Sequence, residues 1–446
     1  MAASCSTIRA VTVTTAARLT TLAMLVLAAL TTHAQTKAND PFRAAEPFAS
    51  PRIAALRLAV AQKQTAALEQ FWAGVRVSGT PLVEPVPREA RYSFVTFVYQ
   101  GSERTRNVVV VDGVAVAVGG VDPRNSEMTR LAGTDVWYRT YKVRNDARFI
   151  YKVSENDPLT SFIDPSRMSD SKLDPLNPRV FSNTGQSYVE LPDAPSQDVT
   201  LHPGAGRGSV EKTTFHSRTL GNDRDVWIYT PHDFRGGAET YPLVVVLDGG
   251  AYTTLVPVPT ILDNLIAQRR IPPVVAVMVN TAAGQRDKEE SCMTSFGDLL
   301  ANEIVPSMRE RYGTTTNPQL TVIGGSSRGA LASSCAAFQH PEVFGKVLSQ
   351  SGSYWWNPDA NPGTEFLTGQ FARSPKLPLQ FYIEAGEMEI DMQLATNRRL
   401  RDVLKAKGYA VDYREFNGNH TYLAWRGTFA DGVISLLGRR TPAAQR

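Results

Sequence analysis

Short apolar runs alternate with stretches of helical spacing through the second half of the chain. Strands that are covered by helices on both faces are apolar throughout, whereas half-exposed strands alternate apolar and polar residues. The pattern therefore predicts an α/β fold with a doubly wound, mostly parallel sheet, preceded by an antiparallel edge strand at 225–231. The apolar runs occupy residues 243–247, 273–279, 320–323, 346–348 and 379–383.

The first half of the chain has shorter β-like runs with turn residues between them. This pattern predicts a small all-β antiparallel sandwich. A helix is expected before it, over residues 51–74. Apolar periodicity is then lost over residues 197–211, where we place a linker between two domains. The β-like runs cover residues 91–99, 107–111, 136–143 and 148–153.

The first residues have the pattern of a cleaved signal peptide. Arg9 and Arg18 occur without any acidic residue, and an apolar stretch follows over 19–30. Small residues come next, and cleavage is expected after Ala34. That stretch is too short to span a bilayer, so we expect a soluble periplasmic protein without a membrane anchor. The predicted organisation is a signal peptide over 1–34, the sandwich domain over 35–196, the linker over 197–211 and an α/β-hydrolase domain over 212–446.

Charge and cysteine content exclude some partners. Loss of the two signal-peptide arginines from 47 basic residues, against 43 acidic ones, lowers the formal net charge from +4 to +2. That balance does not support nucleic-acid binding. Cys5 leaves with the signal peptide, while Cys292 and Cys335 remain and lack the partner spacing of a metal site. No metal or other cofactor is expected, and the pairing of these two cysteines is left open.

The sequence Gly-Ser-Ser-Arg-Gly at 325–329 joins an apolar run to a helix of small residues. This is the G-x-S-x-G pattern of a nucleophile elbow, which nominates Ser327. The flanking glycines keep side chains away from the sharp turn. The N–H of Arg328 would then face a developing oxyanion. A structural Gly/Ser turn can carry the same letters, so the assignment depends on the partners of the serine.

A serine nucleophile needs a base, and the order in α/β-hydrolases is serine, acid, histidine. Only His340 and His420 follow Ser327. His340 precedes a proline near the expected end of the elbow helix, too early for an acid-bearing strand to intervene. His420 lies in a Gly/Asn-rich loop after the strand-like run 411–416. We therefore assign His420 as the base.

The acid should follow the strand predicted over 379–383. Four carboxylates, beginning with Glu384, crowd that segment, and spacing alone does not choose among Glu387, Glu389 and Asp391. A second oxyanion donor is expected after the run 243–247, where two glycines allow close approach of the backbone, and Gly250 is the candidate.

Six short strings carry a resemblance to a known family, at 130–137, 174–178, 247–249, 348–356, 384–386 and 425–427. Together they resemble the enterochelin (enterobactin) esterases, which hydrolyse catecholate siderophore trilactones. The similarity extends over about 92–437, and implies an Ig-like domain packed over an esterase-type hydrolase with the substrate between them. The family pattern Glu-Ala-Gly-x-x-Glu falls on Glu384 and Glu389, so the resemblance selects Glu389 as the acid.

Three positions depart from the family pattern. Ile390 stands where a proline is common, which keeps Glu387 and Asp391 as alternatives. Arg328 stands where an aromatic residue commonly follows the nucleophile, and Asn419 replaces a glycine before the histidine. An exported location also differs from cytoplasmic members, and implies siderophore hydrolysis in the periplasm.

A ferric catecholate carries negative charge and flat rings, so arginines and aromatic side chains are expected in its pocket. A feruloyl-type or other carbohydrate-linked esterase and a non-catalytic siderophore-binding protein are the competing interpretations. The sequence does not indicate which siderophore is preferred, whether the ferric or the iron-free form is the substrate, or what the oligomeric state is. Besides Arg328, the candidate substrate contacts are Arg130, Tyr354, Trp355, Trp356 and Arg426.

Overall fold

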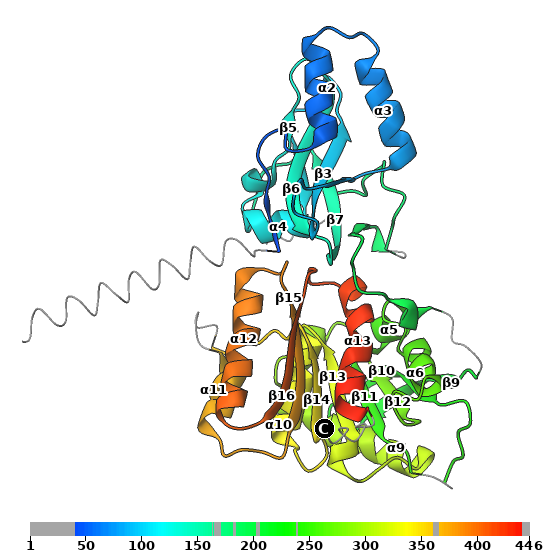
Figure 1. Ribbon diagram of the computed structural model, residues 1–446. Coiled ribbons are helices and arrows are strands. Elements are labelled where there is room, and N and C mark those ends of the chain that lie inside the picture. The colour runs from blue at the N-terminus through cyan, green and yellow to red at the C-terminus, as the bar shows by residue number, and fades with distance from the viewer. Residues whose placement is uncertain are drawn as a thin grey trace, which may run out of the picture.

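The computed structural model describes residues 41–162, 164, 171–181, 184–201, 206–237, 240–359 and 365–438. The predicted signal peptide lies outside these ranges. A smaller N-terminal domain lies over one end of a larger C-terminal α/β domain (Figure 1).

The C-terminal domain is built on an eight-stranded sheet. Its strands are β9 (Ser209–Ser217), β10 (Asn222–Thr230), β11 (Leu243–Leu247), β12 (Val275–Val279), β13 (Thr321–Ser326), β14 (Lys346–Gln350), β15 (Gln380–Gly386) and β16 (Ala410–Phe416). Their order is β16-β15-β14-β13-β11-β12-β10-β9, with β11 to β16 parallel and the last two antiparallel. The predicted mostly parallel sheet is confirmed. The predicted edge strand is wrong, because β10 lies one strand inside the edge and β9 begins within the predicted linker.

Helices cover both faces of this sheet, because its central strands are apolar on both sides. One face packs against α5 (Gly249–Thr254), α6 (Val258–Ala267) and α13 (Tyr422–Leu437). The other packs against α8 (Thr294–Leu299), η5 (Leu300–Ile304), α9 (Val305–Tyr312), α10 (Arg328–Gln339), α11 (Phe366–Arg373) and α12 (Asp391–Ala406). Short α7 (Arg286–Glu289) and η6 (Pro318–Leu320) lie in connections. Cys292 and Cys335 form a disulfide that ties the loop before α8 to α10.

The N-terminal domain contains two antiparallel sheets. One joins β1 (Phe42–Ala44), β6 (Val136–Arg144), β3 (Tyr92–Gln100) and β2 (Leu82–Pro85), with β5 (Thr129–Arg130) paired to β6. The other joins β4 (Val108–Val111), β7 (Arg148–Glu155) and β8 (Ser187–Glu190). Helical segments are α2 (Pro51–Ala61), α3 (Ala67–Ser78), α4 (Val114–Gly119) and η1 (Pro123–Ser126), with η4 (Asp198–Thr200) leading out of the domain.

The domain is thus not all-β, and the single helix predicted over 51–74 is two helices. The break falls at the polar residues between α2 and α3, where Lys63 has a φ of 54°. Apolar side chains of both helices form one core with β3 and β6. The Ig-like assignment remains a prediction.

The two domains meet where the parallel strands end. The loops after β15 and β16 contact the β6–β7 hairpin: Glu387 pairs with Arg144 at 2.9 Å, and the Arg148 N–H donates to the Asn417 carbonyl at 3.1 Å. The carboxyl ends of parallel strands are where such sheets bind ligands. Within the described residues, no helix is both long and apolar enough to cross a bilayer.

Candidate active site

Ser327 occupies a sharp turn between β13 and α10. Its φ and ψ are 55° and −119°, a region that L-residues rarely adopt. A Cβ on Gly325 would lie only 3.0 Å from the carbonyl carbon of Gly329, so the turn closes only because position 325 lacks a side chain. The Ser327 Oγ lies 3.3 Å from the Oγ of Ser353. The elbow predicted from the sequence therefore has strained backbone geometry and close packing of its glycines.

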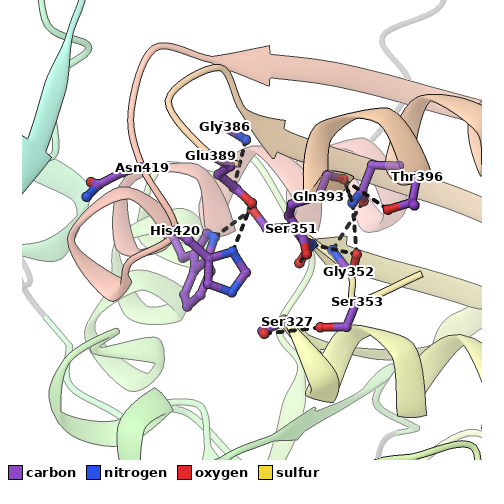
Figure 2. Close-up of polar contacts among 12 residues, drawn as sticks. Ser327, Ser351, Gly352, Ser353, Gly386, Glu389, Gln393, Thr396, Asn419 and His420 are labelled. Atoms are coloured by element: carbon purple, nitrogen blue, oxygen red, sulfur yellow. Dashed lines mark hydrogen bonds and ion pairs between the residues drawn. The ribbon is translucent and has the colours of Figure 1, made fainter. Parts of the chain in front are cut away.

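His420 lies above this turn and is held by Glu389. The His420 Nδ1 is 2.8 Å from Glu389 Oε2, and Figure 2 shows Glu389 between the imidazole and the loop after β14. The other carboxylate oxygen accepts from the Gly386 N–H at 2.9 Å and from the Ser351 hydroxyl at 2.5 Å. Because Nδ1 faces a carboxylate, it carries the proton, which leaves Nε2 free to accept one.

The other candidate residues have different partners. Glu387 forms the ion pair with Arg144 of the N-terminal domain, and burial raises the pKa of this carboxyl. Asp391 is the first residue of α12, a position that favours an acidic side chain because of the helix dipole. His340 lies at the end of α10, 2.9 Å from Asp298 and 3.2 Å from Glu342. Of these residues, the structure brings only Glu389 to His420.

The two predicted oxyanion donors differ. Arg328 begins α10, so its N–H is in the first turn and has no partner within the helix. The Gly250 N–H donates to Asn280 Oδ1 at 2.9 Å, so it is already paired. Its role as the second donor remains a prediction. Asp248, two residues before Gly250, has a φ of 56° and accepts two hydrogen bonds from Arg286, which fix the loop beside the elbow.

A cavity of about 280 Å³ contains the three predicted catalytic residues. Sequence reasoning had not predicted several residues of its wall, among them Asp112, which comes from the N-terminal domain. Burial raises the pKa of this carboxyl, which favours its neutral form. The described residues that line the cavity are Asp112, Val116, Ser327, Ser353, Trp355, Met388, Glu389, Ile390, Met392, Gln393, Asn419 and His420.

A second cavity of about 190 Å³ shares Asp112, Val116 and Ile390 with the first and extends into the N-terminal domain. Its wall is mainly apolar and includes Ile150 and Lys152. The site therefore has a lobe at the catalytic residues and a lobe at the neighbouring domain.

Four non-glycine residues with positive φ directly follow strands near the site. They are Asp112 after β4, Asp248 after β11, Ser327 after β13 and Ser351 after β14. Such strained residues persist only where surrounding contacts hold them, and they gather at functional sites. An Asp-Gly pair after an apolar run at 112–113 was a sequence signal that would have drawn attention to Asp112.

Comparisons with known proteins agree with this arrangement. A family model described as "Enterochelin esterase, N-terminal" matches residues 94–200, and one described as "Putative esterase" matches residues 217–436. The iron(III) enterobactin esterase of Escherichia coli O6:H1 (strain CFT073) is 31% identical over 362 residues, which is 76% of this chain and 88% of the relative. The chain belongs to the enterochelin esterase family.

Other relatives extend over more of this esterase. The iron(III) enterobactin esterase of Dickeya dadantii is 29% identical over 424 residues, covering 84% of the chain and 94% of the relative. A crystal structure of the Shigella flexneri enterobactin esterase, obtained in the presence of enterobactin, matches with a TM-score of 0.67 and 30% identity. It covers 82% of this chain and 97% of that one. The α/β-hydrolase fold with an N-terminal domain and the assignment as a carboxylic ester hydrolase are thereby confirmed.

Only some of the predicted substrate contacts face the cavity of this esterase. Trp355 lines it, with its Nε1 donating to Gln393 at 2.8 Å and the Arg328 guanidinium 5.9 Å from its ring centre. Tyr354 is fully buried, with its hydroxyl paired to Ser334 and Ser349. The prediction that Tyr354 contacts substrate is therefore wrong in this structure, because the side chain packs inside the core.

The remaining three lie elsewhere. Trp356 packs edge-on against Phe366 at 5.6 Å. Arg130, on β5, donates to the Thr134 carbonyl at 2.9 Å. Arg426 donates to Gln197 at 2.6 Å, and its burial lowers its pKa. None of the three is among the described residues that line the two lobes of the site.

Proposed function

We propose that this esterase hydrolyses the ester bonds of an enterobactin-like catecholate siderophore, in its ferric form, and so releases iron in the periplasm. The observation that carries the proposal is the Glu389–His420 hydrogen bond beside the strained Ser327, in a cavity bordered by both domains. Relatives of similar length that bear the name iron(III) enterobactin esterase support the choice of substrate class.

The proposed mechanism uses Ser327 as nucleophile. His420 Nε2 accepts the Ser327 proton as Oγ attacks the ester carbonyl, and Glu389 stabilises the imidazolium that forms. The Arg328 N–H donates to the oxyanion, and a second N–H from the Gly249–Gly250 loop completes the hole. His420 then donates the proton to the departing alkoxide. In the second half of the reaction, His420 accepts a proton from water, which attacks the acyl-serine. The acid leaves, and His420 returns the proton to Ser327.

The surroundings of the site suit a catecholate ligand. Trp355 presents an aromatic face at the catalytic lobe, and the Arg328 guanidinium lies behind the lining residues, 5.9 Å from the centre of that ring. Lys152 provides a second cation at the N-terminal lobe. Arg328 also lies 3.3 Å from the exposed carboxylate of Asp287, so an anionic ligand would compete with that pair.

The periplasmic location rests on the predicted signal peptide and on the disulfide between Cys292 and Cys335. Disulfides form and persist in oxidising compartments and are rare in the cytosol. Detection of the processed protein, starting at Gln35, in a periplasmic extract would support this part of the proposal.

The substrate class is tested by turnover of a ferric catecholate trilactone against methyl ferulate. We expect kcat/KM to be at least about 100-fold higher on the trilactone, because only it occupies both lobes and meets both cations. A preference for methyl ferulate would favour the feruloyl esterase alternative. Tight binding of the trilactone without hydrolysis would favour the siderophore-binding alternative.

The choice of acid is tested by amide substitutions in one loop. We expect Glu389→Gln to lower kcat by about 10³-fold or more, because the neutral amide no longer stabilises the imidazolium or fixes its tautomer. Glu387→Gln is the matched control and should stay within about tenfold of wild type, since Glu387 pairs with Arg144. A larger loss for Glu387→Gln than for Glu389→Gln would move the acid to position 387.

A further inference from the structure

The loop that carries His420 is held by the N-terminal domain. Asn417 Nδ2 donates to Asp146 Oδ1 at 2.8 Å, and the Asn417 carbonyl accepts the Arg148 N–H. Asn419, directly before the histidine, is 1% exposed, and both ends of its amide are bonded across the domain boundary. Figure 2 shows Asn419 on the side of His420 away from Glu389.

The Asn419 amide completes an interrupted strand pair. β4 pairs with β7 through Val111 and Lys152, then turns away at Asp112, where φ is 73°. Ile150, two residues before Lys152 on β7, is thereby left without a β4 partner. Asn419 Oδ1 accepts the Ile150 N–H at 3.2 Å, and Asn419 Nδ2 lies 3.4 Å from the Ile150 carbonyl. The side-chain amide thus takes the place of a peptide unit of β4.

Asp112 provides the third point of attachment. Its Oδ1 accepts from the Gly113 N–H at 2.7 Å and from Asn419 Nδ2 at 2.9 Å, and the residue also lines the catalytic cavity. Gly113 allows this approach, because a Cβ there would lie 2.6 Å from the Ile150 carbonyl oxygen. A glycine at position 419, the residue expected from the family pattern, has no side chain with which to make any of these bonds.

We propose that Asn419, held by Asp112 and Ile150, is a positioning residue that sets His420 against Ser327, so that the docked N-terminal domain completes the catalytic geometry. The inference rests on the proposed Ser327–His420 mechanism and goes beyond it, because it gives the N-terminal domain a part in the chemical step itself. A small ester that never reaches the N-terminal lobe should therefore still depend on Asn419.

The test uses the full-length protein and two readouts. One is the rate at which a fluorophosphonate labels Ser327, and the other is kcat and KM on p-nitrophenyl acetate. We expect Asn419→Ala and Asn419→Gly to lower the labelling rate and kcat by about 10- to 100-fold, the loss that follows from displacing a catalytic group by about 1 Å. KM should change less than about threefold, because Asn419 acts on the histidine and not on a small substrate.

Two further variants separate positioning from general loosening of the domains. Asp112→Asn keeps an acceptor for Asn419 and should retain most activity, whereas Asp112→Ala should lower kcat with little change in KM. Gln197→Ala removes two hydrogen bonds to α13, one to the Leu423 carbonyl and one from the Arg426 guanidinium, at a contact outside the 417–420 loop that carries His420. It should leave the labelling rate within about twofold of wild type, since separate contacts act independently.

A double-mutant cycle decides whether Asn419 and Asp112 act together. If they do, Asp112→Ala combined with Asn419→Ala should lose little more than Asn419→Ala alone. The inference would be overturned if the losses of the two single variants multiplied in the double variant. It would also be overturned if folded Asn419→Ala were labelled at the wild-type rate. If Asn419→Ala does not fold, Asp112→Ala tests the same contact from the N-terminal domain. Wild-type kinetics of Asp112→Ala would then overturn the inference.

These readouts are separate from the test of the substrate. A wild-type protein that is labelled at Ser327 but does not cleave the trilactone would contradict the proposed siderophore and leave the role of Asn419 standing. Absence of any Ser327 labelling in the wild type would reject the serine mechanism, and the inference with it.

Discussion

Ser327→Ala is expected to lower ester hydrolysis by about 10⁴-fold or more, because it removes the atom that forms the acyl intermediate. The fold should be unaffected. Serine and alanine both bear a Cβ, so the backbone strain at a φ of 55° is similar in the two proteins. The hydrogen bond lost with the hydroxyl is a long one, 3.3 Å to Ser353, so its loss should change the stability little. The measurement is kcat on the trilactone and on p-nitrophenyl acetate, with the thermal midpoint as the check on folding.

Ser353→Ala is the matched control for that experiment. It removes a neighbouring hydroxyl from the same cavity, and it should lower kcat by less than about tenfold because Ser353 is outside the proposed relay. Near-wild-type turnover by purified Ser327→Ala would reject the mechanism. Loss of activity in Ser353→Ala alone would move the nucleophile to position 353.

His420→Ala is expected to lower kcat by about 10⁴-fold, because members of a triad act as a unit and the serine loses its proton acceptor. His340→Ala should remain within a few-fold of wild type. Its imidazole lies at the end of α10 between Asp298 and Glu342, and it does not line the catalytic cavity. Parallel assays at one pH, with circular dichroism on each variant, make the comparison.

The opposite result would be informative. A folded but inactive His340→Ala, beside an active His420→Ala, would show that the proton is taken by a different histidine. Such a result would also contradict the positioning role proposed for Asn419, which acts through His420.

Local patterns in the sequence predicted the features that depend on near neighbours. Fully apolar runs such as 243–247 identified strands covered on both faces, and the structure places them in a mostly parallel sheet. Gly325 and Gly329 identified the elbow, and at Gly325 a Cβ would lie only 3.0 Å from the backbone of Gly329. Chain order then separated His420 from His340. Each of these predictions rests on steric rules that act within a few residues.

The same local reasoning failed where long-range packing decides. The pattern over 51–74 suggested one helix, but two separate helices pack onto β3 and β6. β9 begins at Ser209, inside the stretch assigned to the linker for its lack of apolar periodicity, and its pairing with β10 makes it a strand. Tyr354 looked suited to binding substrate, yet its ring is enclosed in the core.

By itself, the sequence determined the sheet type and nominated the serine and the histidine, because periodicity, turn sterics and chain order are properties of neighbouring residues. Spacing left the acid open, and the family pattern favoured Glu389. The tertiary structure then gave the acids of this loop different partners, by bonding Glu389 to His420 and Glu387 to Arg144. It alone brought Asp112 to Asn419, 307 residues further along the chain. Spacing within the sequence does not indicate that two residues so far apart in the chain are in contact, because that contact depends on how the two domains pack.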